Sequence, residues 1–335
     1  MNTLLHNENV ENLTNKLIKA VDENNYSLVE EIILLGKKYP KFNINNEGNY
    51  GMSALMFVND YNIAKLLLDN GANLGYIDIM GESVLSILFN NDKYEMINFL
   101  LEYNNIINHN NSQIINQILS DGDTILTRAI KLHKINYVYL FIKHGADVNM
   151  KDRSTMTPLM IACIHHYSDI VFLLLHYKCD VNIRNYLGQT ALMISCINDD
   201  VEISKELVKN GANVDIPDND GQSPLMSACI TDNDDIVKLL ILNNANVNQL
   251  DNNNRNALIY ACMYDNEDMM KLLLVAGSTY STKNYCILNE IKFIENYINS
   301  KQFQIDKYNL YIENSSLIFS NMVLLSDDYL KFKFQ

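Results

Sequence analysis

Residues 155–163 read T-M-T-P-L-M-I-A-C, and three later segments repeat this pattern. They are G-Q-T-A-L-M-I-S-C from Gly188, G-Q-S-P-L-M-S-A-C from Gly221 and N-R-N-A-L-I-Y-A-C from Asn254. Successive segments start 33 residues apart, and a second apolar block such as D-I-V-F-L-L-L follows each of them. A fixed period of this length is the sequence signature of stacked structural repeats.

The residue pattern of each repeat predicts two short helices joined by a loop. Leu159, Ala162 and Cys163 have the spacing of one helix face, and the second block, which begins at Asp169, has the same periodicity. Gly211 fits the left-handed position that ends a helix. Two helices of this length cannot bury their own apolar faces, so the core must form by stacking of neighbouring repeats.

The pattern resembles the ankyrin repeat, whose motif runs G-x-T-P-L-H-x-A-A, then V-x-L-L-L, then G-A-D-V-N. It is similar above all to the Asn-rich ankyrin repeat proteins of large DNA viruses. The resemblance implies an all-α ankyrin-repeat solenoid of stacked helix–turn–helix units with hairpin-like fingers. Seven units are recognisable, and they start near Gly48, Asp78, Leu119, Asp152, Asn185, Asp218 and Asp251.

The repeats divide the chain into five expected parts. These are a flexible N-terminus (1–9), a degenerate N-terminal capping repeat (10–47), seven ankyrin repeats (48–283), a C-terminal capping helix (284–300) and a segment of unknown structure (301–335). In the last part, residues 330–334 alternate apolar and charged side chains, which is typical of a strand. The finger after the second unit is expected to be longer than the others, within residues 104–119.

Charge and composition exclude several classes of function. The net charge is −14, which disfavours nucleic acid and anionic membranes as partners. No signal peptide or stretch of ~18 apolar residues is visible, so we expect a cytoplasmic protein, with the nucleus as the alternative. We also expect a monomer.

Catalytic, metal and cofactor chemistry is not expected. The cysteines of successive repeats are too far apart for disulfides or a shared zinc ion, because stacked helices lie ~8–10 Å apart. His165 and His166 are neighbours on the chain and point in different directions on a helix. No nucleophile elbow, phosphate loop or kinase signature occurs, so we expect no enzyme activity.

Acidic residues recur between the two helices of a repeat. The clusters are Asp199-Asp200-Glu202, Asp232-Asp234-Asp235 and Asp265-Glu267-Asp268. They are suited to cap the second helix and to interact with its dipole. When the repeats stack, the clusters also form an acidic ridge that would steer a basic partner.

In ankyrin repeats the fingers and the first, inner helix carry the partner contacts, so the resemblance implies a protein partner of unknown identity. Ordinary surface is the alternative interpretation of any single position. The candidate partner-binding residues are Arg153, Met156, His165, Tyr186, Leu187, Gln189, Gln222, Arg255 and Tyr264. The resemblance also implies that turn asparagines can be hydroxylated, with Asn182 and Asn248 as candidates; a turn amide that bonds to the backbone is the alternative interpretation.

The leading hypothesis is therefore a non-enzymatic interaction module or scaffold. The alternative is a substrate adaptor that recruits ubiquitin-ligase machinery, because L-N-E-I-K-F-I-E-N-Y-I from Leu288 faintly resembles the F-box-like helix of viral ankyrin proteins. A capping role for that helix is the other interpretation. The adaptor hypothesis expects deletion of residues 284–335 to remove ligase contact and to keep target contact.

Overall fold

The computed structural model describes residues 10–48, 51–108, 113–279, 291–300, 302–307, 309–310 and 313. In this part of the chain every regular element is a helix, and Ile77 and Ser83 form one isolated β-bridge. The prediction of an all-α repeat fold is confirmed. The chain separates into two compact units, Met1–Pro158 and Leu159–Gln335.

Unit 1 starts with a helix pair that packs against the first repeat. The contacts run from α1 to α2 and to the 3₁₀-helix η2, and from α2 to α3. The elements of unit 1 are α1 (Val10–Asp22), α2 (Tyr26–Gly36), η2 (Ala54–Phe57), α3 (Tyr61–Asp69), α4 (Val84–Asn90), α5 (Tyr94–Asn108), α6 (Ile125–Lys131) and α7 (Ile135–Lys143).

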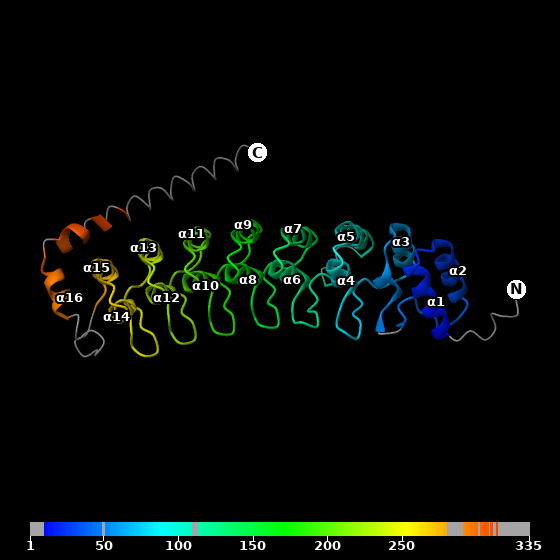
Figure 1. Cartoon of the computed structure of the whole chain (residues 1–335), viewed down its shortest axis with the longest axis horizontal. Helices are drawn as coiled ribbons and strands as arrows, with labels where there is room; N and C mark the ends of the chain where they lie inside the picture. The colour runs from blue at the N-terminus through cyan, green and yellow to red at the C-terminus, as the bar shows by residue number, and fades with distance from the viewer. Residues whose placement is uncertain are drawn as a thin grey trace, which may run out of the picture. The chain divides into compact units, whose positions relative to one another are not determined.

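Unit 2 repeats one helix pair with little variation. Its elements are α8 (Pro158–Ile164), α9 (Ser168–His176), α10 (Ala191–Ile197), α11 (Val201–Lys209), α12 (Pro224–Ile230), α13 (Asp234–Leu242), α14 (Ala257–Met263), α15 (Glu267–Val275) and α16 (Ile291–Ile298). Here α10, α12 and α14 pack as a row of first helices, and α9, α11, α13 and α15 pack as a row of second helices. The fingers of this unit extend away from the second helices (Figure 1).

The core of unit 2 is the interface between repeats. Leu192, Leu225 and Leu258 are buried at equivalent positions of α10, α12 and α14. Cys196 and Cys229 are also fully buried there as free thiols. Small side chains at such positions let neighbouring helices approach closely, so the periodic residues of the sequence are core residues.

In unit 2, the loop between the two helices of each repeat has one residue in the left-handed conformation. His166, Asp199, Asp232 and Asp265 have φ values between 57° and 59°. Asn, Asp and His are the non-glycine residue types that occupy this region most readily. His166 thus takes the same left-handed position as the three aspartates.

The insertion after the second repeat begins as helix rather than as finger. Helix α5 has 15 residues, whereas α7 and α11 have nine. Gly145 and Gly211 follow those shorter helices with positive φ values, and no glycine stands at that place after α5. Of residues 104–119, within which the enlarged finger was expected, residues 104–108 are helical and so lie outside it.

The C-terminal part of the described chain lies on the last repeats. Helix α16 packs against α15 and buries Ile294 completely. The Tyr297 hydroxyl donates to Asp306 across 2.6 Å, and Lys238 of α13 forms an ion pair with Glu313 at 3.0 Å. The expected strand at residues 330–334 and the flexible segment 1–9 lie outside the described residues. The expected domain boundaries stay predictions.

Candidate functional site

Each finger of unit 2 is closed by the side chain of its first residue. The Asp218 carboxylate accepts hydrogen bonds from the backbone N–H groups of Asp220 and Gln222, both at 2.9 Å. Asn185 and Asp251 close their fingers in the same way. Such side-chain turns replace a backbone turn, so each fingertip is held in one conformation.

Neighbouring fingers are tied to each other through the backbone. The N–H of Asn219 donates to the carbonyl oxygen of Leu187, and the N–H of Asn252 donates to that of Asp220, both at 2.9 Å. The side-chain amide of Asn219 also donates to the carbonyl oxygen of Tyr186. Residues at the fingertips are therefore displayed on a continuous hydrogen-bonded edge.

The turn asparagines bridge adjacent repeats. The Asn182 side chain donates to the carbonyl oxygen of Gly211 and accepts from the N–H of Asn213. Asn248 makes the equivalent bonds to Gly277 and Thr279. Both side chains thus have a structural role between repeats, and their hydroxylation stays a prediction.

The loops between the helices form a second row of hydrogen bonds between neighbouring repeats. Asn266 caps α15 by accepting from the N–H of Met269, and its amide donates to Asp232 of the preceding repeat at 2.7 Å. Asn233 caps α13 and donates in the same way to Asp199. The prediction that the acidic clusters supply the caps is therefore right for Asp200 at α11 and wrong for α13 and α15, which asparagines cap.

An apolar row runs along the C-terminal ends of the first helices of unit 2. We define it as Ile164, Ile197, Ile230 and Met263. Three of the four side chains are exposed, Ile164 by 43%, Ile197 by 44% and Met263 by 49%. Asn198 donates to the carbonyl oxygen of Cys163, and Thr231 to that of Cys196, so these helix ends are fixed to one another.

Four of the predicted partner-binding residues are well exposed in unit 2. Tyr186 (65%) and Leu187 (43%) lie on a finger, and Tyr264 (51%) follows the apolar row. His165 is exposed beside Ile164, and its ring stacks on Tyr167 with centroids 5.4 Å apart. These side chains bring aromatic and aliphatic surface to the fingers and the first helices of one unit.

The other predicted residues are less exposed or hold contacts within the chain. Gln189 and Gln222 are half-buried. Arg255 donates to Asp251 at 2.9 Å and lies over the Tyr260 ring at 4.8 Å, so its guanidinium stabilises its own finger. Arg153 and half-buried Met156 belong to unit 1, where Arg153 donates to the carbonyl oxygen of Ser120.

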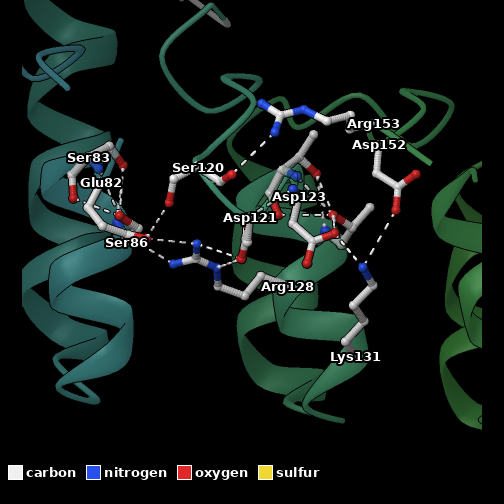
Figure 2. Close-up of polar contacts among 12 residues, drawn as sticks. Glu82, Ser83, Ser86, Ser120, Asp121, Asp123, Arg128, Lys131, Asp152 and Arg153 are labelled. Carbon is white, nitrogen blue, oxygen red and sulfur yellow. Dashed lines mark hydrogen bonds and ion pairs between the residues drawn. The ribbon is translucent and has the colours of Figure 1, made fainter. Parts of the chain in front are cut away.

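Sequence reasoning missed a polar network in unit 1 (Figure 2). Buried Arg128 of α6 contacts both carboxylate oxygens of Glu82, at 2.8 and 3.0 Å, and the Asp121 carboxylate at 2.7 Å. Lys131, one turn further along α6, forms ion pairs with Asp123 and Asp152. An Arg at a position where the other repeats carry Phe, Ile, Ser or Tyr was the available signal.

Burial, hydrogen bonds and nearby charges shift the pKa values of Glu82 and Asp234 in opposite directions. Burial raises the pKa of Glu82, but hydrogen bonds from Arg128 and Ser86 outweigh it, and its pKa lies below the ordinary value. The pKa of Asp234 is raised, first by desolvation and then by nearby carboxylates that include Asp232 and Asp268. The network of unit 1 is therefore compensated, whereas negative charge accumulates between the helices of unit 2.

Burial makes Cys179 and Cys196 unsuited to thiolate chemistry. Burial raises the pKa of Cys196 to about 12 and that of Cys179 to about 11. Among the described residues, no group of three His, Cys, Asp or Glu side chains is arranged to hold a metal ion. The described helices also include none long and apolar enough to cross a membrane.

Comparison with known proteins agrees with this geometry. Residues 104–185 and 179–251 match the family of ankyrin repeats in three copies, and residues 253–284 match a single ankyrin repeat. An ankyrin repeat protein of Acanthamoeba polyphaga mimivirus is 26% identical over 189 residues, which is 47% of this chain and 25% of that protein. The chain thus spans about a quarter of that relative's length. With its stacked helix pairs, Asx-closed fingers and 33-residue period, the chain belongs to the ankyrin repeat family.

Proposed function

We propose that this chain is a non-enzymatic interaction module that binds a target protein through the fingers and first helices of unit 2. Ankyrin repeats are in general protein–protein interaction modules. The observation that carries the proposal is the exposed apolar row, together with exposed Tyr186 and Leu187 on the finger edge. A few well-packed anchor residues, with aromatic side chains prominent among them, supply most of the binding energy at protein interfaces.

The rigid display of these side chains supports binding with little ordering cost. The fingers are joined by backbone hydrogen bonds, and Asn198 and Thr231 fix the ends of the first helices. A surface that is ordered before binding loses less conformational entropy on association. We place the protein in a reducing compartment, the cytoplasm or nucleus, because Cys163, Cys196 and Cys229 are free thiols of the core.

The adaptor alternative receives less support. Its recruiting helix would be α16, but Ile294 of that helix is fully buried against α15. The Tyr297 hydroxyl is engaged by Asp306. This face therefore serves contacts within the chain, which favours a capping role for α16.

Affinity capture from host-type cells, followed by mass spectrometry, tests the proposal. We would compare the wild type with two double variants, Ile197→Ser/Met263→Ser and Tyr186→Ser/Leu187→Ser. Phe172→Ser is the matched control, because Phe172 is exposed to a similar extent on the second helix α9. Truncation of interface anchors typically costs more than ~2 kcal/mol each, so we expect at least ~30-fold less partner with both double variants.

The control and the wild type should recover the same partner, and all variants should keep their helix content and melting temperature. Recovery of one partner by every variant would contradict a role for this face. Recovery of ligase subunits by the wild type would favour the adaptor alternative.

A further inference from the structure

The apolar row and the acidic residues beside it define the chemistry of one kind of partner segment. We infer that the row of unit 2 receives an amphipathic helix of the target, with apolar residues at every seventh position and Lys or Arg along one flank. The inference rests on the proposed function and narrows it from a protein partner to a helical, basic one.

Spacing favours a helix over an extended segment. Neighbouring helices pack ~8–10 Å apart, so successive residues of the row are separated by about that distance. A helix rises ~1.5 Å per residue, and residues seven apart lie ~10.5 Å apart on nearly the same face. An extended strand covers that distance in about three residues, which places successive contacts on opposite faces.

Charge complementarity supplies the second part of the inference. We define the acidic ridge as the nine carboxylates Asp199, Asp200, Glu202, Asp232, Asp234, Asp235, Asp265, Glu267 and Asp268. All of them except half-buried Asp200 are exposed. Ile197 and Met263 each precede a ridge aspartate by two residues, so the row and the ridge run side by side. Residues 190–204, 223–237 and 256–270, which run from each first helix into the start of the second, contain no Lys and no Arg.

Contacts within the chain offset only part of this charge in the middle repeats, where the Asp200 carboxylate lies 3.1 Å from the His166 ring. Asp199 and Asp232 accept from the neutral amides of Asn233 and Asn266. In the last repeat, by contrast, Lys271 forms ion pairs with Glu267 and Asp268. The basic flank of the bound helix should therefore face the loops of the repeats that contain α10 and α12.

Display of a helical peptide library against the full chain tests the inference. The peptides would carry Leu at every seventh position, and the flanking positions would vary among Lys, Glu and Gln. We expect enrichment of Lys on one flank and about tenfold weaker binding of the matching Gln peptide. Enrichment of Glu, no flank preference or no enriched helix would overturn the inference.

Matched charge variants distinguish the effect of the acidic ridge on peptide binding from the effect of the net charge. Asp199→Asn/Asp232→Asn keeps residues that tolerate positive φ and removes two charges from the ridge. Glu30→Gln/Glu31→Gln removes two exposed charges from α2 of unit 1 and is the control. The ridge variant should bind the Lys peptide about three- to tenfold more weakly, whereas the control should bind it like the wild type.

Equal loss in both variants would assign the effect to net charge and overturn the role of the ridge. The inference of a basic helix and the proposed function can be contradicted independently of each other. If row variants abolish capture of a target that offers no basic helix, this inference falls and the proposed function stands. If no target depends on the row, the proposed function itself falls.

Discussion

The side-chain amide of Asn266, which caps helix α15, donates to the carboxylate of Asp232 in the preceding repeat at 2.7 Å. Asp232 is held in the left-handed conformation, with a φ of 59°. Asn233 and Asp199 repeat the same relationship one unit earlier. One asparagine therefore starts a helix and also ties two repeats together, so this contact couples local structure to stacking.

Asn266→Asp should destabilise unit 2 by about 1–2 kcal/mol, although aspartate caps helices as well as asparagine does. The variant loses the donor to Asp232 and places two carboxylates face to face. Added salt should recover part of the loss, because it screens exposed charges. Urea unfolding at low and high ionic strength measures both effects.

The swapped double variant Asp232→Asn/Asn266→Asp provides the control. It restores one amide opposite one carboxylate, and asparagine tolerates the left-handed conformation. We expect the swap to regain most of the stability lost in Asn266→Asp. Equal stability of the single variant and the wild type would show that the contact contributes nothing to stacking.

Arg128→Ala should destabilise unit 1 by about 2–3 kcal/mol, because it leaves Glu82 and Asp121 without their shared cation. Arg128→Lys should fall between the alanine variant and the wild type, since lysine cannot make the paired contacts of a guanidinium. Thermal unfolding followed by circular dichroism tests this order. An unchanged melting temperature for Arg128→Ala would contradict it.

The same network predicts a pH dependence. Because the pKa of Glu82 is lower in the folded chain, its ionised form contributes stability above its unfolded pKa of about 4.3. The contribution is lost as the pH falls through the folded pKa. The wild type should thus exceed Glu82→Gln in stability at pH 7, and the gap should close by about pH 3. A gap that is constant with pH would exclude this linkage.

Asp234→Asn should slightly increase the stability at pH 7, whereas Glu82→Gln should decrease it. The folded pKa of Asp234 is raised, so its ionised form costs stability at pH 7, and the penalty disappears below the unfolded pKa of about 3.9. We expect a gain of at most about 0.5 kcal/mol at pH 7, the usual range for surface substitutions. Chemical unfolding at pH 7 and pH 3.5 measures it, and a loss at pH 7 would contradict the raised pKa.

Periodicity alone predicted the helices and the core. Leu192, Leu225 and Leu258 recur at a fixed interval, and a residue that recurs in a stack meets its own equivalents in the neighbouring repeats. The exposed fingertip residues Tyr186 and Leu187 were predicted from the resemblance to ankyrin repeats, in which the fingers carry partner contacts. Position within the repeat determines which side chains face outward.

Contacts between residues at non-equivalent positions of neighbouring repeats could not be predicted from the repeat period. Asparagine and aspartate both cap helices and both tolerate a positive φ, so the sequence could not show that Asn233 caps while Asp232 takes the left-handed position. Arg128 and Glu82 are 46 residues apart, and their pairing depends on how two fingers meet. The engagement of Arg255 by Asp251 was missed because a finger arginine also suits a partner contact.

Site-specific photocrosslinking tests the central claim most directly. A photoreactive amino acid would replace Met263 in the apolar row or Phe172 on the second helix α9, in the full chain within host-type cells. Binding through the fingers and first helices predicts a crosslinked target protein from position 263 and none from position 172. Crosslinks of equal yield from both positions, or from position 172 alone, would contradict binding through the fingers and first helices.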